Sequence, residues 1–126
     1  MNKPQPIPPT DKTFASTESP DEALAQYVLS HIDPEPDYLY QLYRATNIHT
    51  LHGRMASGHL QGRLLKMLVK MFRPLHILEV GTFSGYSAIC LAEGLETGGK
   101  VWTFEINDEQ EPFTRPWIEQ SAVADK

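Results

Sequence analysis

The sequence predicts an α/β fold in which helices precede a strand–helix–strand unit. Apolar residues recur at helical spacing between positions 19 and 74. Two short runs of strand composition follow, at 76–80 and 101–106, with a helical stretch at 86–95 between them. A glycine-containing turn at 81–85 follows the first run. Strands joined in this way are parallel, and their crossover is right-handed.

Three regions follow along the chain: an arm at 1–18, a helical cap at 19–74, and the strand–helix–strand unit with a following helix at 75–126. The arm is predicted to be disordered because half of the ten prolines fall within the first twenty residues. Proline lacks an N–H donor and biases its predecessor towards extended backbone, so this stretch does not suit a packed element.

The first helix of the cap has a start signal at Ser19-Pro20-Asp21-Glu22, which combines a capping serine with a glutamate three residues later. Asp33-Pro34 ends this helix and starts the next, whose apolar side is expected to contain Leu39, Leu42, Tyr43 and Thr46.

The third cap helix ends at Pro74, after a loop over Asn47–Gly58. We expect one broad apolar face and an opposite basic side with Arg63, Lys66 and Lys70. The apolar face contains Leu60, Leu64, Met67, Leu68, Met71 and Phe72.

The strand–helix–strand unit begins at His76–Val80, a run typical of a buried parallel strand. After the second strand, Asn107 or Asp108 offers a cap for a further helix with Phe113, Trp117 and Ile118 on its apolar side. Pro116 is expected to kink or weaken that helix.

The turn after the first strand carries the chemical signal. Gly81 and Gly85 let the backbone approach a ligand closely, and the N–H groups at the start of the next helix point at the same place. Glu105 ends the second strand, where a carboxylate can accept hydrogen bonds from both ribose hydroxyls of an adenosine.

Two details argue against a dinucleotide. The glycines are spaced Gly-x-x-x-Gly, which leaves the pyrophosphate cradle incomplete. Glu79 also stands directly before the turn, where it would repel a phosphate but could hold the cationic amino group of a methionine moiety. A nicotinamide-binding oxidoreductase therefore stays an alternative that the spacing disfavours.

The stretches ILEVGTFSGYSAICL (Ile77–Leu91) and VWTFEIN (Val101–Asn107) resemble the S-adenosylmethionine-dependent O-methyltransferases of the caffeoyl-CoA and catechol type. The resemblance extends over about Ser30–Lys126, includes Met55–Gly62, and implies a Rossmann-like methyltransferase fold. It implies that Met55 and Ser57 line the S-adenosylmethionine site from the side. The methionine end would be surrounded by Glu79, Gly81, Phe83 and Ser87, and Glu105 would hold the ribose, with Ile106 and Asn107 flanking the adenine.

The resemblance also implies a divalent metal, whose ligands in this family follow the region that the chain matches, as does the general-base lysine. We therefore expect a cofactor-binding N-terminal portion of an enzyme that methylates a hydroxyl of a small molecule, inactive as this isolated chain. A non-catalytic module that binds S-adenosylmethionine, or that associates through its helical cap as a homodimer, is the alternative.

Composition excludes other classes. The formal charge of −5 and pI near 5.4 lack the basic surface that nucleic acid needs, and no apolar run is long enough for a membrane span. Without a secretory signal, we expect a cytoplasmic protein. Cys90 is expected to be a small core residue, the histidines lack a metal-ligand pattern, and the tyrosines at 27, 38, 40 and 43 suit core or oligomer packing better than a substrate pocket.

Overall fold

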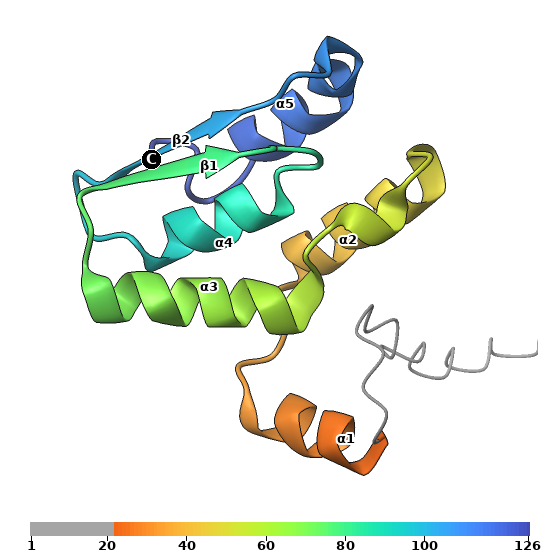
Figure 1. Ribbon diagram of the computed structural model, residues 1–126, viewed down its shortest axis with the longest axis vertical. Helices are drawn as coiled ribbons and strands as arrows, with labels where there is room; N and C mark the ends of the chain where they lie inside the picture. Colours follow the sequence, from red (N-terminus) through yellow and green to blue (C-terminus); the bar gives the residue numbers. More distant parts are fainter. Residues whose placement is uncertain (1–21) are drawn as a thin grey trace, which may run out of the picture.

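The computed structural model describes residues 22–126. A parallel two-stranded sheet, β1 (His76–Val80) and β2 (Lys100–Phe104), lies against a layer of helices (Figure 1). The register pairs His76 with Lys100 and Val80 with Phe104, and helix α4 (Tyr86–Gly94) forms the crossover between the strands. The predicted α/β class with a Rossmann-like strand–helix–strand unit is confirmed.

Three helices precede the sheet: α1 (Glu22–His31), α2 (Asp37–His49) and α3 (Gly58–Phe72), with a 3-10 turn, η1 (Gly53–Met55), before α3. A second 3-10 turn, η2 (Asp108–Gln110), leads into α5 (Glu111–Glu119). The first strand has the predicted bounds, whereas the second begins one residue earlier and ends at Phe104. The predicted arm at 1–18 and the capping signal at 19–21 lie outside the described residues.

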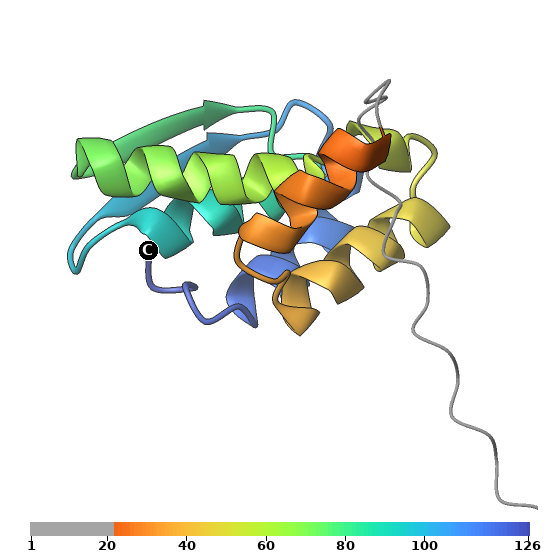
Figure 2. The same cartoon turned by 90° about the horizontal axis from the view of Figure 1, so that it is seen from below.

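The two faces of the sheet differ. Figure 2 shows the helices on one side of the strands and none of the described elements on the other. We call the helix side the covered face, and its residues are half-buried: Ile77, Glu79, Val101 and Thr103. We call the other side the bare face; it begins with His76 and Lys100, and its apolar residues are each at least 58% exposed: Leu78, Val80, Trp102 and Phe104. A parallel sheet is normally covered on both faces.

The core lies between α2, α4 and α5. Its buried members are Leu39, Leu42, Tyr86, Ile89 and Cys90, and partly buried aromatic residues from α2 and α5 pack against them. Tyr38 packs edge-on against Trp117, with ring centroids 5.4 Å apart, and Tyr43 also joins the core. The amphipathic patterns predicted for α2 and α5 are confirmed.

The burial of α3 does not follow its apolar face. All six residues of its predicted apolar face are exposed, from 36% for Leu68 to 77% for Phe72. The helix instead turns its small residues towards α4, since a Cβ on Gly62 would lie 2.6 Å from Cys90 Sγ. Gly94 of α4 meets Val69 of α3 in the same way, with an added Cβ 2.7 Å from the valine Cβ. The close approach of the two backbones decides which side of α3 is buried.

Arg63 was predicted to lie on the basic side of α3, opposite the apolar residues, and it is only 8% exposed. Its guanidinium forms an ion pair with Glu93 of α4 at 2.9 Å, and Lys66 pairs with the same carboxylate at 3.1 Å. A buried charge requires such a partner, so Glu93 is what allows Arg63 to enter the helix interface.

Helix α5 runs through Pro116 to Glu119, although the proline contributes no N–H. After α5 the chain returns to the edge of β2, where the Val101 N–H donates to the Lys126 carbonyl at 2.9 Å. Within residues 22–126, no helix is long and apolar enough to span a bilayer.

Candidate functional site

The turn between β1 and α4 has an unusual backbone. Three of its five residues have positive φ: Gly81 at 97°, Phe83 at 46° and Gly85 at 82°. Glycine adopts this region freely, but for a bulky residue such as Phe83 it is strained. A Cβ on Gly81 would meet nothing within 4 Å, so the backbone there borders open space. The strain at Phe83 indicates that the surrounding contacts hold the turn in one shape.

The turn is anchored to β2 through its backbone. The N–H groups of Gly81 and Thr82 both donate to the Phe104 carbonyl, at 2.8 and 3.2 Å. Within the turn, the Gly85 N–H donates to the Thr82 carbonyl at 2.8 Å. The Thr114 hydroxyl of α5 donates to the Phe83 carbonyl, so both neighbours of the turn restrain it.

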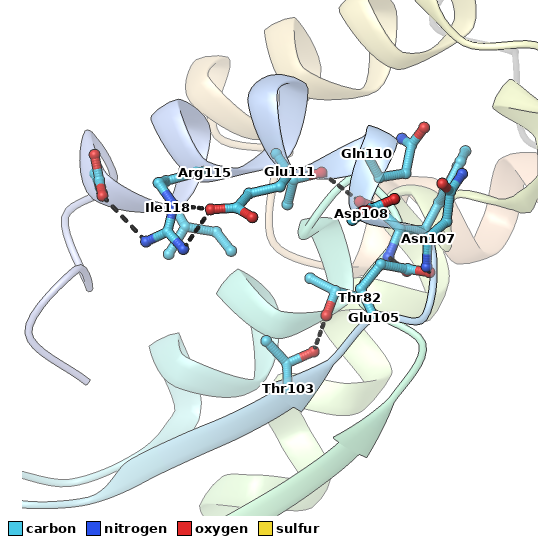
Figure 3. A pocket seen from close by; sticks show the side chains of 12 residues that line it. Thr82, Thr103, Glu105, Asn107, Asp108, Gln110, Glu111, Arg115 and Ile118 are labelled. Carbon is cyan, nitrogen blue, oxygen red and sulfur yellow. Dashed lines mark hydrogen bonds and ion pairs between the residues drawn. The ribbon is translucent and has the colours of Figure 1, made fainter.

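Glu105 lies beside the turn, directly after β2 (Figure 3). Its Oε2 accepts from the Phe83 N–H at 2.8 Å and its Oε1 from the Asn107 N–H at 3.0 Å. The Asn107 and Phe83 amides hold the pKa of the Glu105 carboxyl below its ordinary value, since they stabilise the charged form. The carboxylate is exposed, so it keeps lone pairs available to a ligand.

Glu79 lies on the covered face, opposite Thr103 in the strand register. Its Oε1 accepts from the Ser87 hydroxyl and its Oε2 from the Thr103 hydroxyl, both at 2.6 Å. Because the Thr103 hydroxyl already donates its one proton to Glu79, the Thr82 hydroxyl must donate to Thr103, at 2.7 Å. This chain of hydroxyls connects both strands and the turn to one carboxylate.

A pocket of about 370 Å³ opens beside the turn, between the end of β2 and α5. Figure 3 shows Thr82, Thr103 and Glu105 on its strand side and Ile118 and Arg115 on its helix side. It is also lined by Phe83, Asn107, Asp108, Gln110, Glu111, Thr114 and Glu119.

The structure brings together most of the residues predicted for the site. Glu79 and Ser87 are hydrogen-bonded, and Phe83 is hydrogen-bonded to Glu105, with Gly81 and Gly85 in the same turn. Ile106 follows Glu105 and is fully exposed.

Met55 and Ser57 stand apart from this network. Met55 is 67% exposed at the end of η1, and Ser57 precedes α3. In the described part of the chain, neither side chain takes part in the hydrogen bonds that shape the turn.

Sequence reasoning missed the threonines Thr82, Thr103 and Thr114. The first two carried a signal, because Thr103 interrupts the apolar run from Val101 to Phe104 and Thr82 follows the first glycine. Thr114 carried none, since its role depends on where α5 packs.

Two other chemistries find no support in the described residues. No group of three or more His, Cys, Asp or Glu side chains within 22–126 is arranged to hold a metal ion, so no divalent-metal site can be assigned there. Burial raises the pKa of the Cys90 thiol to about 12, which leaves it protonated at neutral pH. The interpretation of Cys90 as a core residue agrees with its complete burial.

A family model described as O-methyltransferase matches residues 29–126. The chain belongs to the O-methyltransferase family. It is 34% identical over 107 residues to a caffeoyl-CoA O-methyltransferase of Eucalyptus gunnii, covering 83% of this chain and 43% of that protein. Tricin synthase 1 of Oryza sativa subsp. japonica is 34% identical over 122 residues, covering 95% of this chain and 46% of the relative. The chain thus spans less than half the length of these relatives.

Solved structures of the family share the fold. An O-methyltransferase from Bacillus cereus in complex with SAH superimposes with a TM-score of 0.72 at 32% identity, over 82% of this chain and 47% of that one. The O-methyltransferase TomG from Streptomyces achromogenes, in complex with SAM, gives 0.72 at 29% identity, over 82% and 46%. The family assignment removes the support for the nicotinamide alternative.

Proposed function

We propose that this chain forms the cofactor-binding portion of an S-adenosylmethionine-dependent O-methyltransferase that acts on a hydroxyl of a small molecule. The observation that carries the proposal is the fixed and exposed Glu105 carboxylate beside an open glycine turn. Two backbone amides orient this carboxylate and keep it charged. Several of the family's solved structures contain SAM or its product SAH, which supports the same ligand class here.

Each part of the ligand has a matching group. Glu105 suits the two ribose hydroxyls, since it is acceptor-only when charged. Glu79 keeps lone pairs beyond the two hydroxyls that it accepts, and these suit an ammonium group. No side chain caps α4, so the first N–H groups of that helix are donors for a carboxylate. Gly81 leaves open space where any side chain would stand, and exposed Ile106 offers an apolar surface for a base.

The bound cofactor would supply an electrophilic methyl group on a sulfonium. The residues described here would bind and orient that group rather than exchange protons with an acceptor. Positioning of two reactants is itself a large part of catalysis, which is why a rigid turn matters for transfer. We place Met55 and Ser57 at the side of the same site, as the family resemblance implies, and we expect the protein in the cytoplasm.

The test is calorimetric titration of the purified chain with S-adenosylmethionine. We expect saturable binding that falls at least about tenfold in Glu105→Ala, because two oriented hydrogen bonds to a charged group are lost. Glu96→Ala is the matched control, since it removes the same charge from an exposed glutamate that pairs with Arg73 instead. NAD should not compete.

A folded chain that does not bind S-adenosylmethionine would contradict the proposal. The second candidate, an interaction module without cofactor, would then lead. It is favoured by the bare face, and by α1, which has no buried residue and exposes Leu24 and Tyr27.

A further inference from the structure

Tyr86 connects the turn to the helical cap. It is the first residue of α4 and directly follows Gly85, the last residue of the turn. Its side chain is 1% exposed, and its hydroxyl donates to Glu35 Oε1 at 2.6 Å. Glu35 lies in the linker between α1 and α2, 51 positions earlier. One hydrogen bond therefore joins the end of the turn to a distant part of the cap.

The ring of Tyr86 is fixed from two further sides. It packs edge-on against Tyr43 of α2, with ring centroids 6.0 Å apart at 74°. A Cβ on Gly62 of α3 would lie 2.9 Å from Tyr86 Cε1, so the ring fills the space that this glycine leaves. The linker, α2 and α3 all contact one side chain, and that side chain begins the helix that follows the turn.

The other restraints on the turn act elsewhere. Phe104 holds its first two residues, while Glu105 and Thr114 hold Phe83. Gly85 has positive φ and carries no side chain of its own, so the direction in which α4 leaves the turn depends on the residues that follow it. Ser87 ties the start of α4 to Glu79 of the sheet, and Tyr86 ties it to the cap.

We propose that Glu35 and Tyr86 form a positioning pair through which the cap sets the placement of the turn and of the first N–H groups of α4 for S-adenosylmethionine binding. This inference rests on the proposed function. The pair does not touch the cofactor and acts through the backbone of Gly85 and the first turn of α4. The cap is then part of the binding apparatus.

The test uses Tyr86→Phe, Glu35→Ala and the double variant in the full chain, titrated with S-adenosylmethionine where all are folded. Each single variant should raise the Kd by about 3- to 10-fold, as expected for loss of one hydrogen bond to a charged group. The double variant should be no weaker than the weaker single one, because both changes remove the same bond. The amide NMR signals of Gly81, Phe83 and Gly85 should shift in all three.

Tyr38→Phe is the matched control. It removes a tyrosine hydroxyl that donates to the Trp117 carbonyl, a bond between cap and α5 that does not involve the turn. This variant should lower the melting temperature and leave the Kd and the turn amide signals unchanged. A purely structural role for the pair would give this same pattern in Tyr86→Phe.

The outcomes separate the two proposals. If the wild-type chain binds S-adenosylmethionine and the folded variants bind with the wild-type Kd, the positioning pair is wrong and the proposed function stands. If the folded wild-type chain does not bind, both are wrong. If Tyr86→Phe fails to fold, Glu35→Ala decides, because Glu35 is only half-buried.

Discussion

The covered and bare faces of the sheet distribute polar and apolar residues in opposite ways. The covered face contains Glu79 and Thr103, and helices pack against it, whereas the bare face has apolar side chains at all positions except His76 and Lys100 at the start of the strands. A strand that alternates between core and water would show the reverse pattern. The polar residues are inside because they hold the turn, and the apolar residues outside form a surface suited to contact with protein.

This difference suggests where the described chain derives its stability. The helix side contains the core, the ion pairs and the site, so changes there should act on folding and binding. The bare face adds apolar area that no element within residues 22–126 covers (Figure 2), so changes there should act mainly on association. Four predictions test this division, from the largest expected effect to the smallest.

The largest effect is expected at Gly62, where α3 and α4 are closest. Gly62→Val would place a Cβ 2.6 Å from Cys90 Sγ and force the helices apart. We expect a loss of about 3 kcal/mol or more in the free energy of unfolding, measured by urea denaturation. Val80→Leu enlarges a side chain on the bare face and should change stability by less than about 0.5 kcal/mol. Equal losses of stability in Gly62→Val and Val80→Leu would contradict the division between the helix side and the bare face.

The next effect concerns ion pairs. Arg63→Ala leaves Glu93 in the helix interface with Lys66 as its remaining partner, and it should cost about 2–3 kcal/mol. Arg73→Ala removes a pair with Glu96 whose side chains are 68% and 64% exposed, and it should cost no more than about 0.5 kcal/mol. Thermal unfolding of both variants in low and high salt would check the order, and a larger loss in Arg73→Ala would contradict it.

The bare face should control association. We expect the 126-residue chain to self-associate, because four large apolar side chains are exposed together. The double variant Leu78→Gln/Trp102→Gln should be more monomeric by sedimentation velocity, with a change in stability of about 1 kcal/mol or less. The covered-face pair Ile77→Gln/Val101→Gln should instead lower stability. A wild-type chain that remains monomeric at all concentrations would contradict the prediction.

The smallest expected effect is a shift in the pH at which binding to S-adenosylmethionine is lost. The pKa of Glu105 is lowered from 4.5 by its two backbone donors, so this carboxylate stays charged below the pH at which an ordinary glutamate protonates. Its contribution to binding and stability is therefore complete above pH 4.5 and is lost as pH falls through the lowered value. Calorimetric titration with S-adenosylmethionine over this range, with circular dichroism to follow folding, should show the loss beginning below pH 4.5. In Glu105→Gln, binding should be weak and should lose the part of the pH dependence that comes from Glu105.

The sequence predicted the strand–turn–helix unit well because its signals are local. The run at 76–80 is bounded by Pro74 and Gly81, and the glycines that terminate the strand are also those that shape the turn. The position of Glu105 followed from the end of the second strand. These features depend on residues close together in the chain, so short patterns reveal them.

The burial of α3 could not be predicted from the sequence, because periodicity identifies an apolar side but not the neighbour that will cover it. Close packing through Gly62 outweighed the six apolar residues, and Arg63 entered the interface because Glu93, thirty positions later, supplies a partner. The hydrogen bond between Glu35 and Tyr86 could not be predicted either, because the two residues are 51 positions apart in the chain. Long-range pairings of this kind depend on the packing of whole elements.

The hydrogen bond between Thr103 and Glu79 also favours one register of the two strands over its neighbours. Because side chains alternate between faces, a slip of one residue between β1 and β2 would turn Thr103 away from Glu79 and leave a carboxylate without that donor beneath the helices. The observed register is thus the one in which the Glu79 carboxylate keeps its hydrogen bond from Thr103. Substituting Glu79 would disturb strand alignment and ligand contact together, whereas exposed Glu105 can be changed with far less effect on the sheet.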